Sequence, residues 1–239
     1  MLALWIMQYH LHQNLLIHFL KLLHHLVTLK HYQTYILLFP KLIAGPIVRY
    51  HEIADQITNR EKNYTSSIKL SGFLIFCIGL AKKTIIANTL GIQADAVFKL
   101  PPEQIDTIAA WVGALAYSFQ IYFDFSGYSD MAIGLGKMMG FKFPENFNNP
   151  YTSKSITEFW RRWHISLSTW FRDYLYIPLG GSRGGTWMKV RNTFIIFLVS
   201  GFWHGANWTF IIWGALNAIY FLPLLLTNNN RNNLDVVAH

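Results

Sequence analysis

The sequence predicts an all-α fold, a polytopic bundle of transmembrane helices. Hydrophobic residues make up 52% of the 239 residues and charged residues only 13%, whereas a soluble domain carries about 25% charged residues. The apolar runs are also long: residues 193–227 contain no Asp, Glu, Lys or Arg. A membrane helix needs roughly 20 mostly apolar residues. Both observations favour lipid as the main solvent of a chain long enough for one domain.

The charge balance and the cysteine count narrow the functions that the chain can have. A net charge of +8 is explained by Lys and Arg that flank membrane segments and face anionic headgroups or the cytoplasm. A nucleic-acid-binding protein would need a polar basic domain with aromatic platforms. The sequence contains no such domain, so no nucleic-acid partner is expected. Cys77 is the single cysteine, which excludes an intrachain disulfide and a thiolate metal cluster.

Residues 1–34 form an atypical His-rich hydrophobic segment that contains no Asp or Glu. Histidine-rich tracts can bind metal, but these histidines show no regular ligand spacing. We therefore expect no metal site here, and interpret the segment as an unusual membrane helix or as sequence outside the domain proper. The histidines are His10, His12, His18, His24, His25 and His31.

The segment 36–50 predicts a kinked or re-entrant element rather than a straight span. Pro40, Gly45 and Pro46 interrupt its apolar residues, and proline and glycine both disfavour a regular helix. Irregular backbone at membrane depth is tolerated only where protein covers it. We therefore expect neighbouring helices to bury this element.

Two further spans are expected in the first two thirds of the chain. The run 70–81 is short for a membrane helix, so it must borrow neighbouring residues, and we expect it to end at Lys82-Lys83. The second span begins with residues 107–123 and continues past Asp124 toward Phe141.

Two carboxylates in the second of these spans need partners. Asp124 and Asp130 flank a short Phe-Ser-Gly-Tyr-Ser sequence, and a buried carboxylate is stable only when it is paired. Arg161 and Arg162 are the candidate partners. An ion pair that supports helix packing is preferred to direct catalysis by either aspartate.

A helix is expected to begin at Ser155, because Ser155 and Glu158 form the pattern of a capping box. Aromatic residues then recur at i, i+3, i+4 and i+7 spacing, which predicts one helix with an aromatic face. His164 lies on that face, as a hydrogen-bonded interface histidine or as a catalytic group; the spacing leaves both open. The face comprises Trp160, Trp163, His164, Leu167, Trp170, Phe171 and Tyr174.

The longest apolar run is expected to form two helices, or a helix and a broken helix, that meet near His204. His204 is its one ionisable side chain, and an ionisable group at membrane depth indicates function. In a dry pocket the imidazole would be neutral and able to accept a proton from a hydroxyl group. The alternative is a structural histidine bonded between helices. Side chains expected to wall or orient the ring are Ser200, Trp203, Asn207 and Trp208.

Polar connectors complete the predicted organisation. Residues 143–153 read as an ordered loop, and 180–185 as a glycine-rich turn around Arg183. The expected domains are the atypical segment 1–34, a core over 35–227, and a polar, disordered tail over 228–239.

Four motifs together resemble the alginate O-acetyltransferase branch of the membrane-bound O-acyltransferase superfamily. They occupy residues 38–47, 122–136, 159–181 and 200–208 in this order, and the resemblance extends over about residues 35–220. It implies a fold of transmembrane, re-entrant and interfacial helices around a funnel or tunnel. Because members of the family are considerably longer, the chain is expected to be truncated at both ends.

The resemblance also implies a chemistry. His204 and His164 would be catalytic, and Asn207, Trp203 and Trp160 would contact the substrate or an oxyanion. An acyl thioester, acetyl-CoA or an acyl-carrier protein, would be the cosubstrate, with no tightly bound cofactor and no metal. The expected setting is the bacterial cytoplasmic membrane, crossed several times. The partners would be the lipid bilayer, an extracytoplasmic acetyltransferase protein and a polysaccharide acceptor.

Two alternatives from other classes stay open at this point. The chain could be an inactive membrane fragment that binds only partners or lipid. It could also be a haem or metal protein with His164 and His204 as axial ligands, which requires the two imidazoles to face each other across a planar cavity.

Overall fold

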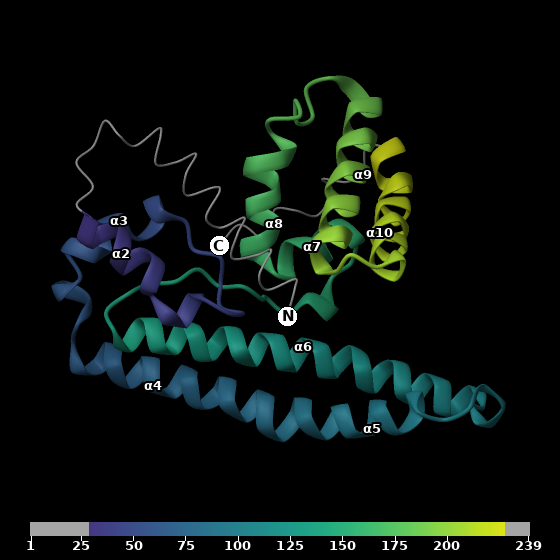
Figure 1. Cartoon of the computed structure of the whole chain (residues 1–239), viewed down its shortest axis with the longest axis horizontal. Coiled ribbons are helices and arrows are strands. Elements are labelled where there is room, and N and C mark those ends of the chain that lie inside the picture. Colours follow the sequence, from purple (N-terminus) through teal and green to yellow (C-terminus); the bar gives the residue numbers. More distant parts are fainter. Residues whose placement is uncertain (1–28, 228–239) are drawn as a thin grey trace. The chain divides into compact units, whose positions relative to one another are not determined.

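The computed structural model describes residues 29–227, which fold entirely into helices, turns and loops (Figure 1). The all-α prediction is therefore confirmed for this part of the chain. Most of the atypical segment 1–34 and the whole tail 228–239 lie outside the described residues. The chain divides into two compact units, which meet in sequence at Asn146 and Phe147. Each unit is described by itself.

The first unit is dominated by a long antiparallel pair of helices (Figure 1). One helical run consists of α4 (Ser66–Ala81), a π-helical turn η3 (Lys82–Ala87) and α5 (Asn88–Phe98). Its partner is α6 (Thr107–Met138), which confirms that the helix predicted from residue 107 continues past Asp124. That α6 spans the membrane stays a prediction. The run from Ser66 is 33 residues long and apolar enough to cross a membrane.

Glycines set the closest approach of α4 and α6. Gly72 lies against Gly134, and Gly79 lies against Gly127; a Cβ atom on Gly79 would come within 2.5 Å of the Gly127 carbonyl oxygen. Both helices thus carry glycine at a seven-residue spacing, the repeat that keeps one face of a helix against its neighbour. Small residues allow backbones to approach where lipid supplies no hydrophobic force between helices.

Lys82 and Lys83 do not end the helix, which corrects the prediction for the run 70–81. Lys82 forms an ion pair with Asp130 at 2.6 Å, and Lys83 forms an ion pair with Asp124. The π-helical turn η3 carries both lysines toward α6, where the aspartates neutralise them. Both aspartates thus have lysine partners within their own unit, and a contact with Arg161 or Arg162 stays a prediction. The prediction of a packing ion pair itself is confirmed.

Short elements precede the helix pair in the first unit. They are α2 (Leu29–Leu37), η1 (Phe39–Lys41), α3 (Tyr50–Thr58) and η2 (Glu61–Asn63), while η4 (Pro102–Gln104) lies before α6. The segment between α2 and α3 is bent, as its prolines and glycine predicted, and the hydroxyl of Tyr35 donates to the carbonyl of Val48 at 2.8 Å across it. Whether this segment is re-entrant stays a prediction.

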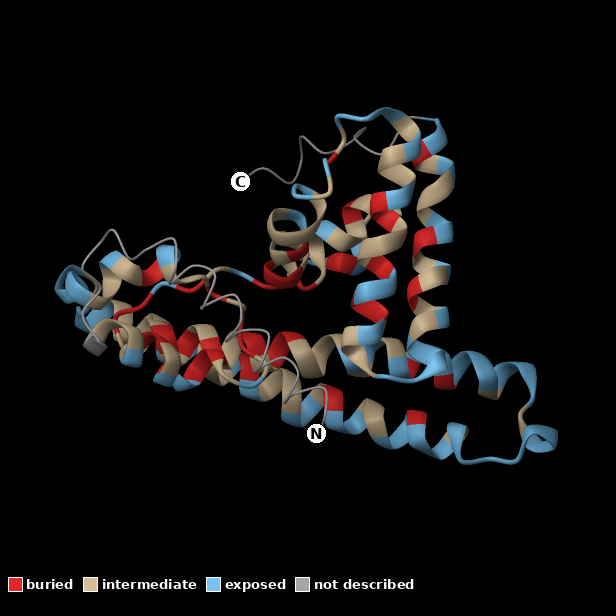
Figure 2. Ribbon diagram, turned by 45° about the horizontal axis from the view of Figure 1, so that its top comes forward, coloured by how far each residue is buried: buried red, intermediate tan, exposed pale blue. Residues whose placement is uncertain are grey.

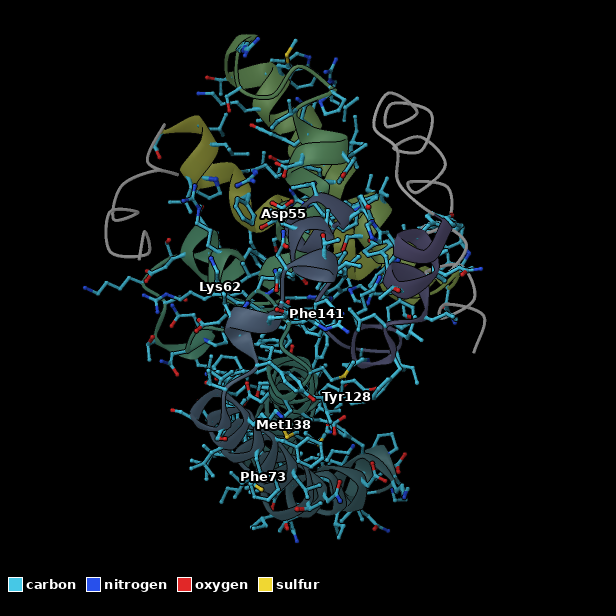
Figure 3. The ribbon with its side chains drawn as sticks, turned by 90° about the vertical axis from the view of Figure 1, so that its left-hand side faces the viewer. Asp55, Lys62, Phe73, Tyr128, Met138 and Phe141 are labelled. Atoms are coloured by element: carbon cyan, nitrogen blue, oxygen red, sulfur yellow. The ribbon has the colours of Figure 1, made fainter. Side chains whose placement is uncertain are left out.

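Side chains of the first unit are drawn in Figure 3, which labels Phe73 on α4, Met138 at the end of α6, and Phe141 just beyond it. Phe141 stacks on Phe143 with ring centroids 6.3 Å apart.

Figure 2 shows buried residues where α4 and α6 face each other, and exposed residues over most of α5 and the adjoining end of α6. These exposed residues are mainly apolar, among them Ile92, Ile108 and Trp111.

The second unit contains η5 (Pro150–Thr152), α7 (Ile156–Arg162), α8 (Ile165–Phe171), the π-helical turn η6 (Arg172–Tyr176), α9 (Gly185–His204) and α10 (Trp208–Leu226). The two long helices α9 and α10 form the expected hairpin with its break after His204. Within the described residues, α10 is the second helix that is long and apolar enough to cross a membrane. The turn before α9 has the predicted glycine-rich form, with positive φ at Gly180, Gly181 and Gly185.

Candidate active site at His204 and His164

The helix α7 begins where the sequence predicted and holds its position through its first turn. The hydroxyl of Ser155 accepts from the backbone N–H of Glu158 at 3.2 Å. The Glu158 carboxylate bonds back to the N–H of Lys154 rather than to that of Ser155, at 2.8 Å. Arg162 pairs with the same carboxylate at 2.7 Å and donates to the carbonyl of Asn148. This network ties α7 to the preceding loop.

The predicted continuous aromatic helix is wrong, because the chain breaks at Trp163 and His164. Trp163 is extended and ends α7, and His164 has φ 45° and ψ 55° in the left-handed region. That conformation is uncommon for a residue with a side chain, costs about 1–3 kcal/mol, and is concentrated at functional sites. The break turns the chain between α7 and α8 and places the His164 imidazole in the interior.

His164 is almost completely buried, with 6% of its surface exposed. Its ring stacks on Phe147, with 6.4 Å between centroids and 18° between planes. Burial, and secondly the charge of nearby His204, lowers the pKa of His164 from 6.5 to about 3. The imidazole is therefore neutral at physiological pH, and the two histidines lie within electrostatic reach of each other.

His204 is the last residue of α9 and is partly buried. Three aromatic rings surround its imidazole: Trp203 at 4.8 Å, Trp213 at 5.2 Å and Phe210 at 6.3 Å between centroids. Trp208 was expected as a wall of this site, but it is the first residue of α10 and is 77% exposed. That expectation was wrong.

The remaining predicted site residues occupy different positions around His204. Asn207 is exposed and caps α10, since its side-chain oxygen accepts from the N–H of Thr209 at 3.2 Å. Ser200 is buried one turn before His204. Arg161 follows Trp160 on α7. The roles assigned to these residues stay predictions.

Trp160 connects α7 to the histidine on α9. Its ring lies edge-on to Trp213 at 5.9 Å and to Phe197 at 5.4 Å, and Trp213 in turn contacts His204. The indole Nε1 of Trp160 is buried and has no hydrogen-bond partner within residues 29–227. Leaving a buried N–H donor without a partner costs free energy. The Trp160 N–H is therefore suited to donate to an oxygen atom of a ligand.

Two residues of the site escaped the sequence reasoning, Trp213 and Phe210. The signal for Trp213 was present, because Gly201 and Gly214 are the small residues at which α9 and α10 approach each other closely. A tryptophan next to the second glycine must then lie near His204, which follows the first by one turn. Phe210 lies against Gly205 and had no such signal.

The described residues contain no group of three or more His, Cys, Asp or Glu that could hold a metal ion. The haem alternative for His164 and His204 is not tested by the geometry and stays a prediction.

Comparison with known proteins yields one family and several relatives. The sequence profile of the membrane-bound O-acyltransferase family (MBOAT) matches residues 3–233. A probable alginate O-acetylase of Pseudomonas aeruginosa is 56% identical over 189 residues, which are 79% of this chain and 36% of that protein. A peptidoglycan O-acetyltransferase of Helicobacter pylori is 49% identical over 79% of this chain and 36% of that protein. A teichoic acid D-alanyltransferase of Bacillus subtilis is 35% identical over 77% of this chain and 49% of that protein.

The chain thus spans about a third of the length of the first two of these relatives. The residues that the family profile matches, 3–233, include the aromatic and histidine-bearing segments described above.

Proposed function

The chain belongs to the membrane-bound O-acyltransferase family, and from that premise we propose that it carries the acyl-transfer site of a bacterial cell-surface polysaccharide O-acetyltransferase. The enzyme would cross the cytoplasmic membrane several times, with re-entrant and interfacial helices around a funnel or tunnel. Its acyl group would come from a thioester, acetyl-CoA or an acyl-carrier protein. Acetyl is favoured over D-alanyl because the O-acetylating relatives are 56% and 49% identical, against 35% for the D-alanyltransferase.

His204 is the proposed general base. Its imidazole takes the proton of an acceptor hydroxyl as the oxygen attacks the carbonyl carbon of the thioester. The tetrahedral intermediate then collapses, the carbon–sulfur bond breaks, and the leaving thiolate receives the proton from His204. Trp203, Phe210 and Trp213 around the ring support this role, because they hold the imidazole and limit the access of water.

The observation that carries the proposal is the burial of the His164 imidazole within electrostatic reach of His204. Burial, and secondly the charge of His204, lowers the pKa of His164 to about 3, so the His164 imidazole stays neutral during the reaction. Its N–H is suited to stabilise an oxyanion without changing its charge. The unpartnered Nε1 of Trp160 is a second donor of this kind. Asn207 and Trp203 remain candidate substrate contacts.

The chain is proposed to act with a separate extracytoplasmic protein that places the acyl group on the polymer. The G-x-S-x-G pattern at residues 180–184 lies in a turn that follows the helical segment η6 rather than a strand, so it does not form a serine nucleophile elbow. Base chemistry is therefore proposed as the principal contribution of the chain. A surface for a donor phosphate or for that partner is proposed on four arginines: Arg161, Arg162, Arg172 and Arg183. Lipid would cover the exposed apolar residues of α4, α5 and α6.

The proposal can be tested with a chimera in which this chain replaces the 189 matching residues of the Pseudomonas aeruginosa relative. The chimera is expressed in a strain that lacks the relative, and the acetyl content of its alginate is measured. Restored acetylation supports the proposal. A chimera that accumulates in the membrane at the level of the relative, yet leaves alginate unacetylated, argues against it.

Reconstitution separates the role of the partner from that of the chain. The chimera is placed in liposomes with a labelled acetyl thioester and soluble glycan, with and without the extracytoplasmic protein. Transfer that requires the added protein is expected. Efficient transfer to glycan without it contradicts the proposed division of labour.

A further inference from the structure

Lys41 is a buried lysine whose position nothing in the proposed reaction explains. It lies at the end of η1 with 6% of its surface exposed. Its Nζ atom is buried and finds no hydrogen-bond partner within residues 29–227. The ammonium group lies 3.4 Å from the ring centroid of Tyr35, a cation–π contact.

The backbone around Lys41 holds it in this position. A Cβ atom on Gly45 would lie 2.3 Å from the carbonyl oxygen of Pro40 and 2.8 Å from the Cα of Lys41, so the turn is closed tightly over η1. The Tyr35 hydroxyl is held by the carbonyl of Val48, and its ring is held edge-on by Tyr50 at 5.5 Å. The aromatic platform under the ammonium is therefore fixed on both sides.

The energetics make an unpaired lysine here unfavourable for stability alone. Moving an ammonium group out of water costs more free energy than a desolvated cation–π contact returns. The pKa of Lys41 is lowered to about 7 by burial, with no anion to raise it. By contrast, Lys82 and Lys83 in the same unit each have an aspartate partner. An apolar side chain of similar length would fit the same space at lower cost.

We infer that Lys41 is the cationic element of a binding site for a small oxyanion, a carboxylate or a phosphate group, with Tyr35 as its aromatic wall. The anion supplies the hydrogen-bond acceptor that the Nζ atom of Lys41 lacks among residues 29–227. Charge-assisted hydrogen bonds of an ammonium group to a carboxylate or phosphate are the strong ones. Because the site uses none of the residues around His204, it stands independently of the proposed acyl transfer.

The site can be tested on the purified chain in detergent micelles by thermal unfolding. Sodium phosphate and sodium acetate are each compared with sodium chloride at matched ionic strength. We expect a saturable rise in Tm with at least one of the two, and the arm that responds identifies the oxyanion. Lys41→Met should abolish the rise, and should unfold no earlier than the wild type without anion. Lys62→Met, which removes an exposed lysine of the same unit, should keep the rise.

No rise in either arm, or a rise that survives in Lys41→Met, overturns the inference. If Lys41→Met does not fold, the wild type answers the same question through labelling with an amine-reactive ester and peptide mass spectrometry. At an anion concentration of ten times Kd, labelling of Lys41 should slow by roughly tenfold while that of Lys62 is unchanged. Equal labelling of Lys41 with and without anion overturns the site.

Discussion

Trp213 of α10 stands edge-on to His204 of α9, with ring centroids 5.2 Å apart and planes at 88°. His204 is the last residue of α9, and its side chain is held by the aromatic rings around it. Trp213 also contacts Trp160 on α7. One tryptophan therefore links the proposed base to the helix that leads into His164.

Replacing Trp213 is expected to lower activity without removing any proposed catalytic group. Trp213→Leu should reduce acetylation by the chimera by about tenfold to a hundredfold, because a small misplacement of a reacting group is that costly. Trp213→Phe should lose less, since it keeps an aromatic edge. Trp208→Leu is the matched control, because Trp208 is 77% exposed. Equal acetylation in the Trp213→Leu and Trp208→Leu variants would show that the contact does not position His204.

The buried His164 should make the protein sensitive to acid. In the folded state its pKa is about 3, while in the unfolded chain a histidine takes up its proton near pH 6.5. Between these values the unfolded chain binds more protons, so stability is lost as pH falls from about 6.5 toward 3, by roughly 1.4 kcal/mol per unit.

The measurement is the free energy of unfolding of the purified chain in micelles between pH 7 and 4. His164→Asn tolerates the left-handed backbone but cannot titrate in this range, so its stability should fall less steeply. Parallel curves for the two proteins would contradict the buried, neutral imidazole.

The paired charges between the two long helices should be coupled. Asp130→Asn leaves Lys82 without its partner and should destabilise the chain by up to about 3 kcal/mol, the low end for a buried pair because each side chain is 27% exposed. Combining Lys82→Met with Asp130→Leu should recover much of that loss. Asp124→Asn should likewise reduce membrane accumulation rather than turnover.

Thermal unfolding and membrane abundance measure these effects. Lys99→Met is the control, since the Lys99–Asp95 pair is 77% and 69% exposed and should contribute less than about 1 kcal/mol. Normal abundance of Asp124→Asn with lost acetylation would assign Asp124 to catalysis instead.

Two helical glycines of the first unit, Gly127 and Gly91, should respond differently to replacement by alanine. Gly127→Ala places a Cβ atom 2.7 Å from the Gly79 carbonyl oxygen, so α4 and α6 must separate, at about 1–3 kcal/mol. Gly91→Ala meets its nearest atom at 3.6 Å and should be neutral or slightly stabilising, because alanine favours helix. Thermal unfolding of the two variants gives the comparison. Similar stability in both would rule out the close approach.

Much of the fold was predictable because its signals are local. The break after His204 follows from glycines and polar residues within one apolar run, and the start of α7 follows from the cap at Ser155. The continuation of the helix through Lys82 did not follow, because its partner Asp130 lies 48 residues away. Two adjacent lysines after an apolar run resemble the end of a membrane helix as long as the aspartates that pair with them are not known.

The site was predictable in part for the same reason. His204 stands out through its isolation among apolar residues, a property of sequence alone. The break at His164 has no glycine or proline to mark it, and its left-handed backbone accompanies packing on Phe147 in the folded chain. Regular spacing therefore predicted a longer helix than the one that forms.

The acetyl content of alginate made by the chimera carrying His204→Ala tests the central claim most directly. The variant is compared with the unsubstituted chimera and with His164→Asn, each at matched membrane abundance. The account predicts that His204→Ala abolishes acetylation, because the general base is gone, and that His164→Asn lowers it strongly. Acetylation at the unsubstituted level in His204→Ala would contradict the account.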